Sequence, residues 1–289
     1  MRHVGIDVGG TKCHGVAVDG DGTVVAEVRR PTPHASELVE ILSGIFTELG
    51  GETTLGIGLP GLITPDGVVV ASPNMRGANN VPVGPGLRAA LGAAVHVEND
   101  ATLAAYGEWK AGAALGARDA VMVTLGTGIG GGIVMGGELQ RGAHGFAGEI
   151  GHMMVVRDGI ECPCGRRGCW ERYASGTALR DLAGGIEGPE IIERSRRGDA
   201  HATTVVREFA DWIAVGLASL TNICDPEVIV IGGGVVESFD VIMPLVDEFL
   251  GQRLYSSAWR PRPRVTTAML GERAGAVGGA LIAGTVFSG

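Results

Sequence analysis

The sequence predicts an α/β protein with two lobes, and three observations lead to this prediction. Short apolar runs of strand type alternate with longer segments of helical periodicity along the chain. A strand, a glycine turn and a return strand open the chain, and the same pattern recurs near residue 120. With 289 residues, the chain has room for one large domain or two medium ones.

The first half begins with an apolar run HVGIDV, the turn GGTK and a second run CHGVAVD, which predict a hairpin. Apolar residues at helical spacing predict an amphipathic helix over 35–49. LGIGLPG at 55–61 reads as a buried strand that ends in a Pro-Gly turn. AVHVEND at 94–100 predicts another strand, and the Ala-rich segment that follows predicts a helix.

The second half begins with a strand at 120–125, a glycine turn and a return strand. Apolar residues from Val205 to Leu220 predict a long helix, and DPEVIVIGGGVVES predicts strand, turn and helix start. A strand RVTTAML and a helix of small residues at 273–286 end the chain. We expect one lobe of residues 1–110 plus 273–289, a second of 111–272, and a cleft between them.

Composition narrows the possible partners. The net charge is −9 without a strongly basic block, which argues against nucleic acid as the main partner. No run of 18 apolar residues and no signal peptide appear, so no membrane partner is expected. Three cysteines grouped at metal spacing, with Cys13 and Cys224 single, favour a reducing cytoplasm over a disulfide framework.

The segment 145–171 carries a predicted structural zinc site. Cys162, Cys164 and Cys169, together with His152, form a set of four nitrogen and sulfur ligands. Three unliganded thiols spaced by Pro and Gly are difficult to explain as core. A catalytic zinc with an open position is the minor alternative, and His152 would be replaced as a ligand if it turned to a substrate.

Two glycine turns are candidates for phosphate binding. In DVGGTK, the N–H groups of Gly9, Gly10 and Thr11 can hold phosphate oxygens, and Asp7 can orient a hydrated Mg²⁺. LGTGIGGG at 125–132 lacks the spacing of the usual mononucleotide and dinucleotide loops, because a strand pattern resumes after it. The alternative for each is an ordinary hairpin turn. IGGGVV at 231–236 has two interpretations, close approach of a nucleotide to the backbone and close helix–strand packing.

The motif END at 98–100 stands between a predicted strand and a predicted helix. Asp100 can serve as a general base that takes a proton from an alcohol during phosphoryl transfer. Considered alone, the residue is better explained as the cap of the helix.

Five motifs follow one another in an order that resembles the ROK family of sugar kinases and repressors over nearly the whole chain. They are DVGGTK, END, LGTGIGGG, GEIGH and CPCGRRGCWE. The resemblance implies two α/β lobes of the actin/hexokinase (ribonuclease H-like) type and a homodimer or larger homo-oligomer. It implies Asp100 as catalytic base and a sugar site that includes it. The other implied sugar ligands are Asn99, Glu149, His152 and Glu171. The implied nucleotide ligands are Asp7, Gly9, Gly10, Thr11, Lys12, Gly126, Thr127, Gly128, Gly233 and Gly234, and the zinc ligands are those named above.

Two features depart from the family pattern or divide its members. The segment SPNMRGANN has no aromatic residue after Pro73-Asn74, at a loop that borders the sugar pocket in the family. No helix-turn-helix segment precedes DVGGTK, which favours a kinase over a DNA-binding regulator.

We therefore expect phosphorylation of a hexose, with glucose as the first candidate, at its 6-hydroxyl by Mg·ATP. The alternatives are a kinase of N-acetylhexosamine, mannose or fructose, a polyphosphate-dependent kinase, a sugar sensor without turnover, and an unrelated zinc-stabilised binding protein.

Overall fold

The computed structural model describes residues 2–19, 22–72, 75 and 77–287, so Pro73 and Asn74 of the predicted sugar-pocket loop lie outside the described part. The chain divides into two compact units. The first unit contains 1–118, 132–148 and 268–289, and the second contains 119–131 and 149–267.

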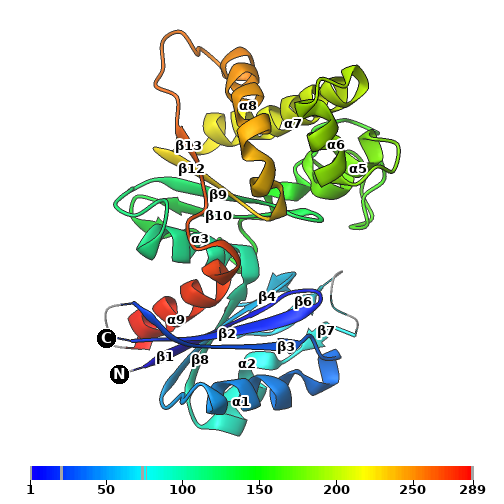
Figure 1. The fold of residues 1–289 in the computed structure, drawn as a ribbon. Helices are drawn as coiled ribbons and strands as arrows, with labels where there is room; N and C mark the ends of the chain where they lie inside the picture. The colour runs from blue at the N-terminus through cyan, green and yellow to red at the C-terminus, as the bar shows by residue number, and fades with distance from the viewer. Residues whose placement is uncertain (1, 20–21, 73–74, 76, 288–289) are drawn as a thin grey trace. The chain divides into compact units, whose positions relative to one another are not determined.

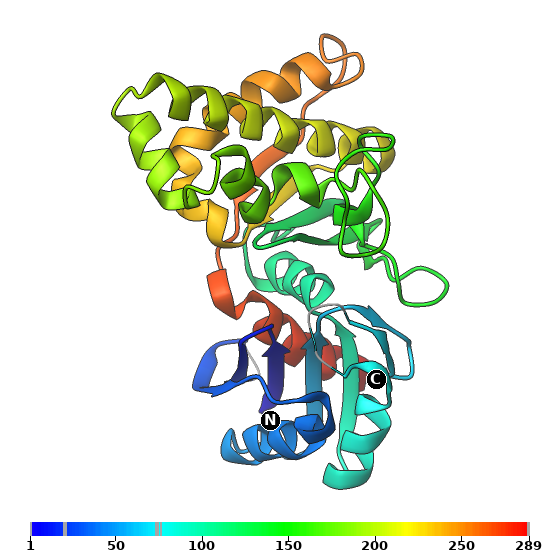
Figure 2. The ribbon, with the colours of Figure 1, turned by 90° about the vertical axis from the view of Figure 1, so that its right-hand side faces the viewer.

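The first unit is built on a mixed five-stranded sheet (Figures 1 and 2). Its strands, in the order β3-β2-β1-β4-β8, are β3 (Val24–Pro31), β2 (Lys12–Val18), β1 (His3–Val8), β4 (Thr54–Leu59) and β8 (Ala94–Asn99). The hairpin β1–β2 is antiparallel, whereas β1, β4 and β8 run parallel. The carboxyl ends of these three parallel strands therefore meet at one edge of the sheet.

Helices cover both faces of this sheet. The helices are α1 (Leu38–Glu48), α2 (Val83–Leu91), α3 (Asp100–Ala111) and α9 (Ala274–Phe287), with the 3-10 turns η1 (Ala35–Glu37) and η4 (Gly271–Arg273). Leu42 of α1 and Leu87 of α2 share one core with Val4 and Ile6 of β1. Short strands β5 (Leu62–Ile63), β6 (Val69–Ala71) and β7 (Asn79–Val81) form a separate small sheet.

Glycines allow α9 to lie very close to the other face of the sheet. A Cβ on Gly5 of β1 would lie 1.9 Å from the carbonyl oxygen of Ala276, and one on Gly56 of β4 equally close to that of Gly279. Any larger residue at either strand position would push the helix away. The small side chains of the predicted C-terminal helix are thus explained by its contact with strand backbone.

The second sheet has the order β11-β10-β9-β12-β13, formed by β11 (Glu138–Leu139), β10 (Ile129–Met135), β9 (Ala120–Leu125), β12 (Val228–Gly232) and β13 (Arg264–Thr267). β12 is parallel to both β9 and β13. The helical elements of the second unit are η2 (Ile150–His152), α4 (Glu171–Ala174), α5 (Gly176–Leu182), α6 (Gly188–Arg196), α7 (Ala200–Cys224), η3 (Gly234–Ser238) and α8 (Phe239–Arg253).

The sequence-based elements agree with this structure to within a few residues. The helix expected over 35–49 is α1 preceded by a 3-10 turn, and the long helix through Val205 and Leu220 is α7. The strand expected over 94–100 ends one residue earlier, at Asn99. None of the helices in the described residues is both long and apolar enough to span a bilayer.

Candidate active site and metal centre

Two carboxylates meet at the carboxyl edge of the first sheet. Asp7 lies near the end of β1, where it pairs with Gly58 of β4. Asp100 follows β8, and Gly58 separates the two acidic residues. A Cβ on Gly58 would lie 3.1 Å from Asp7 Oδ1 and 3.2 Å from Asp100 Cα. The glycine thus leaves the space in which both acidic side chains sit.

Burial and mutual repulsion make ionisation of this pair unfavourable. Burial, then the nearby charge of Asp100, raise the pKa of Asp7 from 3.8 to about 8, although Lys12 opposes the shift. Burial likewise raises the pKa of Asp100, against hydrogen bonds from backbone N–H groups. A carboxylate whose pKa is raised toward neutrality is a better proton acceptor than an ordinary aspartate.

The structure separates the roles of the END residues. Asn99 is the N-cap of α3, and its side chain accepts a hydrogen bond from the Thr102 N–H at 3.0 Å. The interpretation of Asp100 as the cap was therefore wrong by one residue. Asp100 is the first helical residue, and its Oδ1 accepts from the Ala101 N–H at 2.8 Å. The Asn99 side-chain NH₂ also donates to the carbonyl of Gly61 at 3.2 Å.

The first glycine hairpin spans Gly9 to Lys12, between β1 and β2. The Gly9 N–H donates to the Lys12 carbonyl at 2.9 Å, so the turn itself uses one of the three predicted amide donors. Thr32, the residue after β3, stabilises the turn, because its hydroxyl donates a hydrogen bond to the Gly9 carbonyl at 2.6 Å. Gly10 and Thr11 form the exposed tip.

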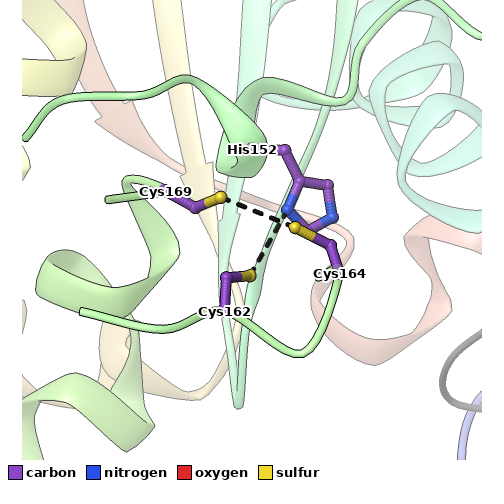
Figure 3. A group of neighbouring side chains, drawn as sticks. All are labelled: His152, Cys162, Cys164 and Cys169. Carbon is purple, nitrogen blue, oxygen red and sulfur yellow. Dashed lines mark hydrogen bonds between the residues drawn. The ribbon is translucent and has the colours of Figure 1, made fainter. Parts of the chain in front are cut away.

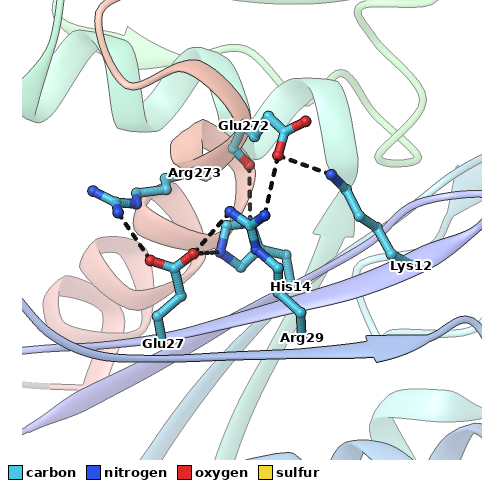
Figure 4. Close-up of polar contacts among 6 residues, drawn as sticks. All are labelled: Lys12, His14, Glu27, Arg29, Glu272 and Arg273. Atoms are coloured by element: carbon cyan, nitrogen blue, oxygen red, sulfur yellow. Dashed lines mark hydrogen bonds and ion pairs between the residues drawn. The ribbon is translucent and has the colours of Figure 1, made fainter.

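Lys12 belongs to a network of charged side chains on β2, β3 and η4 (Figure 4). Its Nζ lies 2.8 Å from Glu272 Oε2. Next to this pair, His14 lies 2.8 Å from Glu27, which also contacts Arg29 and Arg273. Glu272 is largely exposed and Lys12 about half exposed, so the ion pair is weak and a phosphate group can compete for the ammonium.

The second glycine hairpin, 126–128, joins β9 to β10. The Gly126 N–H donates to the Gly128 carbonyl at 3.0 Å, which parallels the internal bond of the first hairpin. The start of α5 supports the turn, because the Gly176 N–H donates to the Gly126 carbonyl and the Thr177 hydroxyl to the Thr127 carbonyl, at 2.8 and 2.7 Å. This support from α5 was not predicted from the sequence.

A pocket of about 660 Å³ in the second unit adjoins this hairpin. Its lining includes Gly126, Thr127 and Thr177 on one side and Gly234 and Val235 on another. The preceding Gly233 has φ +87°, and a Cβ there would lie 2.3 Å from the Leu125 carbonyl oxygen. Gly233 therefore allows the turn after β12 to pack against the end of β9 beside the pocket.

His152, Cys162, Cys164 and Cys169 converge as the sequence predicted (Figure 3). Their four ligand atoms all lie within 4.8 Å of one another. Cys164 Sγ is 3.6 Å from Cys169 Sγ, and Cys162 Sγ is 3.8 Å from His152 Nδ1. In a tetrahedral zinc site, neighbouring ligand atoms stand about 3.5–3.8 Å apart. The donor set therefore fits zinc, with Nδ1 as the nitrogen that faces the thiols.

Thiol ionisation within the cluster is uneven. Burial raises the pKa of Cys162, and its hydrogen bond to Glu171 raises it further. Burial also opposes ionisation of Cys164, but hydrogen bonds from Cys162, the Arg166 N–H and Cys169 outweigh it and lower the pKa. Cys164 is therefore the thiol of the cluster that ionises most easily, and a bound cation would favour ionisation of the other two.

The loop that carries the cysteines is anchored by the residues around Cys169. Trp170 is fully buried, and its indole N–H donates to the Trp212 carbonyl of α7 at 2.8 Å. A Cβ on Gly216 would overlap the Trp170 ring at 2.0 Å. Gly168 adopts φ +78°, and a Cβ there would lie 1.7 Å from the Val156 carbonyl oxygen, so only glycine fits. The contacts of Trp170 with α7 thus anchor the part of the loop next to Cys169.

Two acidic residues lie beside the cluster. Glu171 Oε1 is 3.0 Å from Cys162 Sγ and 3.7 Å from His152 Nδ1. Its Oε2 accepts from the Ile129 N–H at 3.5 Å and lies 2.7 Å from where a Cβ on Gly128 would stand. Glu149 Oε2 is 3.9 Å from His152 Nε2. The imidazole thus faces the thiols with one nitrogen and a carboxylate with the other.

Residues 3–286 match the family model described as ROK family. The chain belongs to the ROK family. The predicted resemblance is therefore confirmed, and the fold is that of the ROK sugar kinases, an α/β fold of the actin/hexokinase type.

Among ROK relatives, the chain is 36% identical to a glucokinase of Streptomyces coelicolor, over 97% of this chain and 96% of that protein. It is 32% identical to an N-acetyl-D-glucosamine kinase of Vibrio cholerae, over 97% and 99%. A ROK glucokinase from Streptomyces griseus, solved with glucose and AMPPNP, superposes with a TM-score of 0.86 at 36% identity, covering 99% of this chain and all of that one.

The predicted site residues of this ROK protein fall into two groups within the units. The first unit contains Asp7, the first hairpin, Asn99 and Asp100. The second unit contains the second hairpin, the metal cluster, Glu149, Glu171, Gly233 and Gly234. Gly58 and Thr177 were not predicted from the sequence, because the partners of each lie far away in the chain. Only the presence of a glycine within an apolar strand pointed to Gly58.

Proposed function

We propose that this ROK protein transfers the γ-phosphoryl group of Mg·ATP to the 6-hydroxyl of a hexose, with glucose as the first candidate. The observation that carries the proposal is the pair of Asp7 and Asp100 at the carboxyl edge of the first sheet. The glycine hairpin Gly9–Lys12 follows directly after the strand that carries Asp7. Identity to the glucokinase relatives supports glucose, and identity to N-acetylglucosamine kinases keeps N-acetylhexosamines as the alternative.

In this proposal Asp100 is the base that accepts the proton of the attacking hydroxyl. Burial raises the pKa of Asp100, and this suits the role, because a carboxylate with a raised pKa accepts a proton more readily than an ordinary aspartate does. Asp7 faces the Mg²⁺ that accompanies the nucleotide, and that cation offsets the repulsion between the two carboxylates.

The two units contribute different groups to the substrates. The first supplies Asp100, Asn99 and the hairpin of Gly9, Gly10, Thr11 and Lys12 as the small lobe, and the second supplies the remaining ligands as the large lobe. Glu149, His152 and Glu171 hold the hexose. Gly126, Thr127 and Gly128 hold the phosphates. Gly233 and Gly234 bind the adenosine end, and Gly234 lines the pocket of about 660 Å³.

We propose zinc as a structural ion held by His152 Nδ1 and the three cysteines. It would stabilise the loop that presents Glu171 and orient His152, whose other nitrogen remains available to the sugar or to Glu149. The clustered free thiols favour the reducing cytoplasm. A homodimer or larger homo-oligomer stays part of the proposal.

ADP release measured across a panel of hexoses tests the function. We expect turnover with glucose to exceed that with mannose, fructose and N-acetylglucosamine, with ATP as donor. Replacement of ATP by inorganic polyphosphate should abolish most of the rate, because the pocket beside Thr177 and Val235 has room for a nucleoside. An absence of ADP release with every sugar would refute the proposal, and a preference for N-acetylglucosamine would correct the substrate.

Substitution of Gly233 by alanine should raise the KM for ATP about tenfold, because the new methyl group cannot approach the Leu125 carbonyl and the turn must move. The KM for glucose should change little. Gly234→Ala is the matched control, since a Cβ at 234 meets nothing within 4 Å and should perturb ATP binding less. Equal effects of the two substitutions on the KM for ATP would contradict the steric explanation.

A further inference from the structure

An ion pair with a buried carboxylate and a partly exposed arginine connects the END motif to the loop that precedes Glu149. Glu98, the first residue of END, has a side chain only 5% exposed. Its Oε2 accepts a hydrogen bond from Arg141 Nε at 2.6 Å, and His96 Nε2 lies 3.6 Å from the same oxygen. Both residues belong to the first unit.

The charges around Glu98 favour its ionised form. Burial alone would raise the pKa of Glu98, but the nearby His96 and the hydrogen bond and charge of Arg141 outweigh burial and hold the pKa below its ordinary value. Loss of the Arg141 guanidinium would leave a buried carboxylate with poorer compensation. The pair therefore constrains Arg141 more firmly than an exposed ion pair would.

Arg141 begins a closed loop. Its carbonyl accepts from the Ala147 N–H at 3.1 Å, which closes residues 141–147 into one turn-like unit. Gly145 adopts φ +84°, and a Cβ there would lie 2.6 Å from the Ile63 carbonyl of β5. The loop is therefore packed against β5 at one point and tied to Glu98 at another.

The same carboxylate also contacts the end of β8. Glu98 Oε1 accepts from the Asn99 N–H at 3.4 Å, and the Asn99 side chain reaches the Gly61 carbonyl just before β5. Glu98 thus joins the END segment to the loop 141–147, and the neighbouring Asn99 joins it to the residue before β5. In the chain, this loop is followed within two residues by Glu149, a proposed sugar ligand.

We infer that Glu98 and Arg141 are positioning residues of the hexose site, and that they hold the loop 141–147 in register with Asn99 and Asp100. The inference rests on the proposed function, because it assigns these residues to the sugar rather than to the nucleotide. If the pair were only structural, its loss would lower the thermal stability and change the KM values for both substrates alike. Loss of a positioning pair should raise the KM for the hexose selectively.

Steady-state kinetics of Arg141→Gln, Glu98→Gln and the double variant test the inference. Each single substitution should raise the KM for glucose about tenfold or more and leave the KM for ATP within about twofold. The double variant should be no worse than the more severe single variant, because the two side chains act as one unit. Arg141→Lys keeps the charge and should restore part of the glucose affinity.

Arg30→Gln is the matched control, because it removes an exposed ion pair with Glu48 elsewhere in the first unit. It should leave both KM values unchanged. An unchanged KM for glucose, an equal rise in the KM for ATP, or additive effects in the double variant would each overturn the inference. If Arg141→Gln does not fold, the same criteria are applied to Arg141→Lys. A wild-type protein inactive on every sugar would refute the proposed function instead, so the two failures are distinguishable.

Discussion

Asp100→Asn should lower kcat by about 10²–10⁴-fold and leave the protein folded. Asparagine cannot accept the proton of the sugar hydroxyl, yet its side-chain oxygen can still accept the hydrogen bond from the Ala101 N–H. Glucose affinity, measured by calorimetry, should change only a few-fold, since the amide preserves the shape of the site. Turnover near that of the wild type would show that Asp100 is not the base.

The stability of this variant follows from the raised pKa values. The folded protein holds protons on Asp7 and Asp100 that the unfolded chain would already have released. The contribution of these two carboxyls to the free energy of unfolding is therefore greatest below about pH 4, and that of Asp7 is lost as the pH rises through about 8. Removing one of the two charges should therefore keep or raise the melting temperature at pH 8. Asp66→Asn, which changes an exposed residue of the same unit, is the control and should alter neither rate nor melting temperature.

The pH dependence of the wild-type enzyme provides a second check on the same residue. Because Asp100 acts in its ionised form, kcat/KM should fall on the acid side as the pH drops through its raised pKa, well above the value of an ordinary aspartate. This acid limb should be missing from the residual activity of Asp100→Asn.

Removal of the proposed zinc should lower the melting temperature by about 5 °C or more, because the metal would tie the loop of Cys162 and Cys164 to His152. Cys164→Ser should lose the bound metal and show the same lower melting temperature without chelator. Metal content by atomic absorption and thermal unfolding with and without a chelator measure both effects.

Cys224→Ser is the matched control for this experiment. Cys224 is a buried thiol at the end of α7, outside the cluster, so its replacement should preserve the zinc content and the response to chelator. Identical melting temperatures of the wild-type protein before and after chelation would argue against a structural zinc. Loss of hexose affinity together with the metal would support the link through Glu171 and His152.

Local patterns carried most of what the sequence predicted. The metal cluster was identifiable because three of its four ligands lie within eight residues, and α7 because its apolar residues repeat at helical spacing. The assignment of the cap to Asp100 failed because Asn and Asp are both good caps and a shift of one residue decides which one serves.

What the sequence could not give depends on contacts between distant residues. Gly58 leaves room for two acids that approach from neighbouring strands, and Trp170 reaches a carbonyl more than forty positions away. The pairing of Glu98 with Arg141 likewise joins residues 43 positions apart. Periodicity and motif spacing contain no information about such partners, because they describe only neighbours along the chain.

The insertion of α9 between distant parts of the first unit has a consequence for biosynthesis. Gly275–Gly279 lie against β1, β4 and α3, so the first unit is completed by residues that leave the ribosome after residues 149–267. Residues 149–267, by contrast, emerge earlier and form most of the other unit. Nascent chains should therefore acquire protease resistance in their middle portion first, and the amino-terminal strands must wait for the carboxyl-terminal helix.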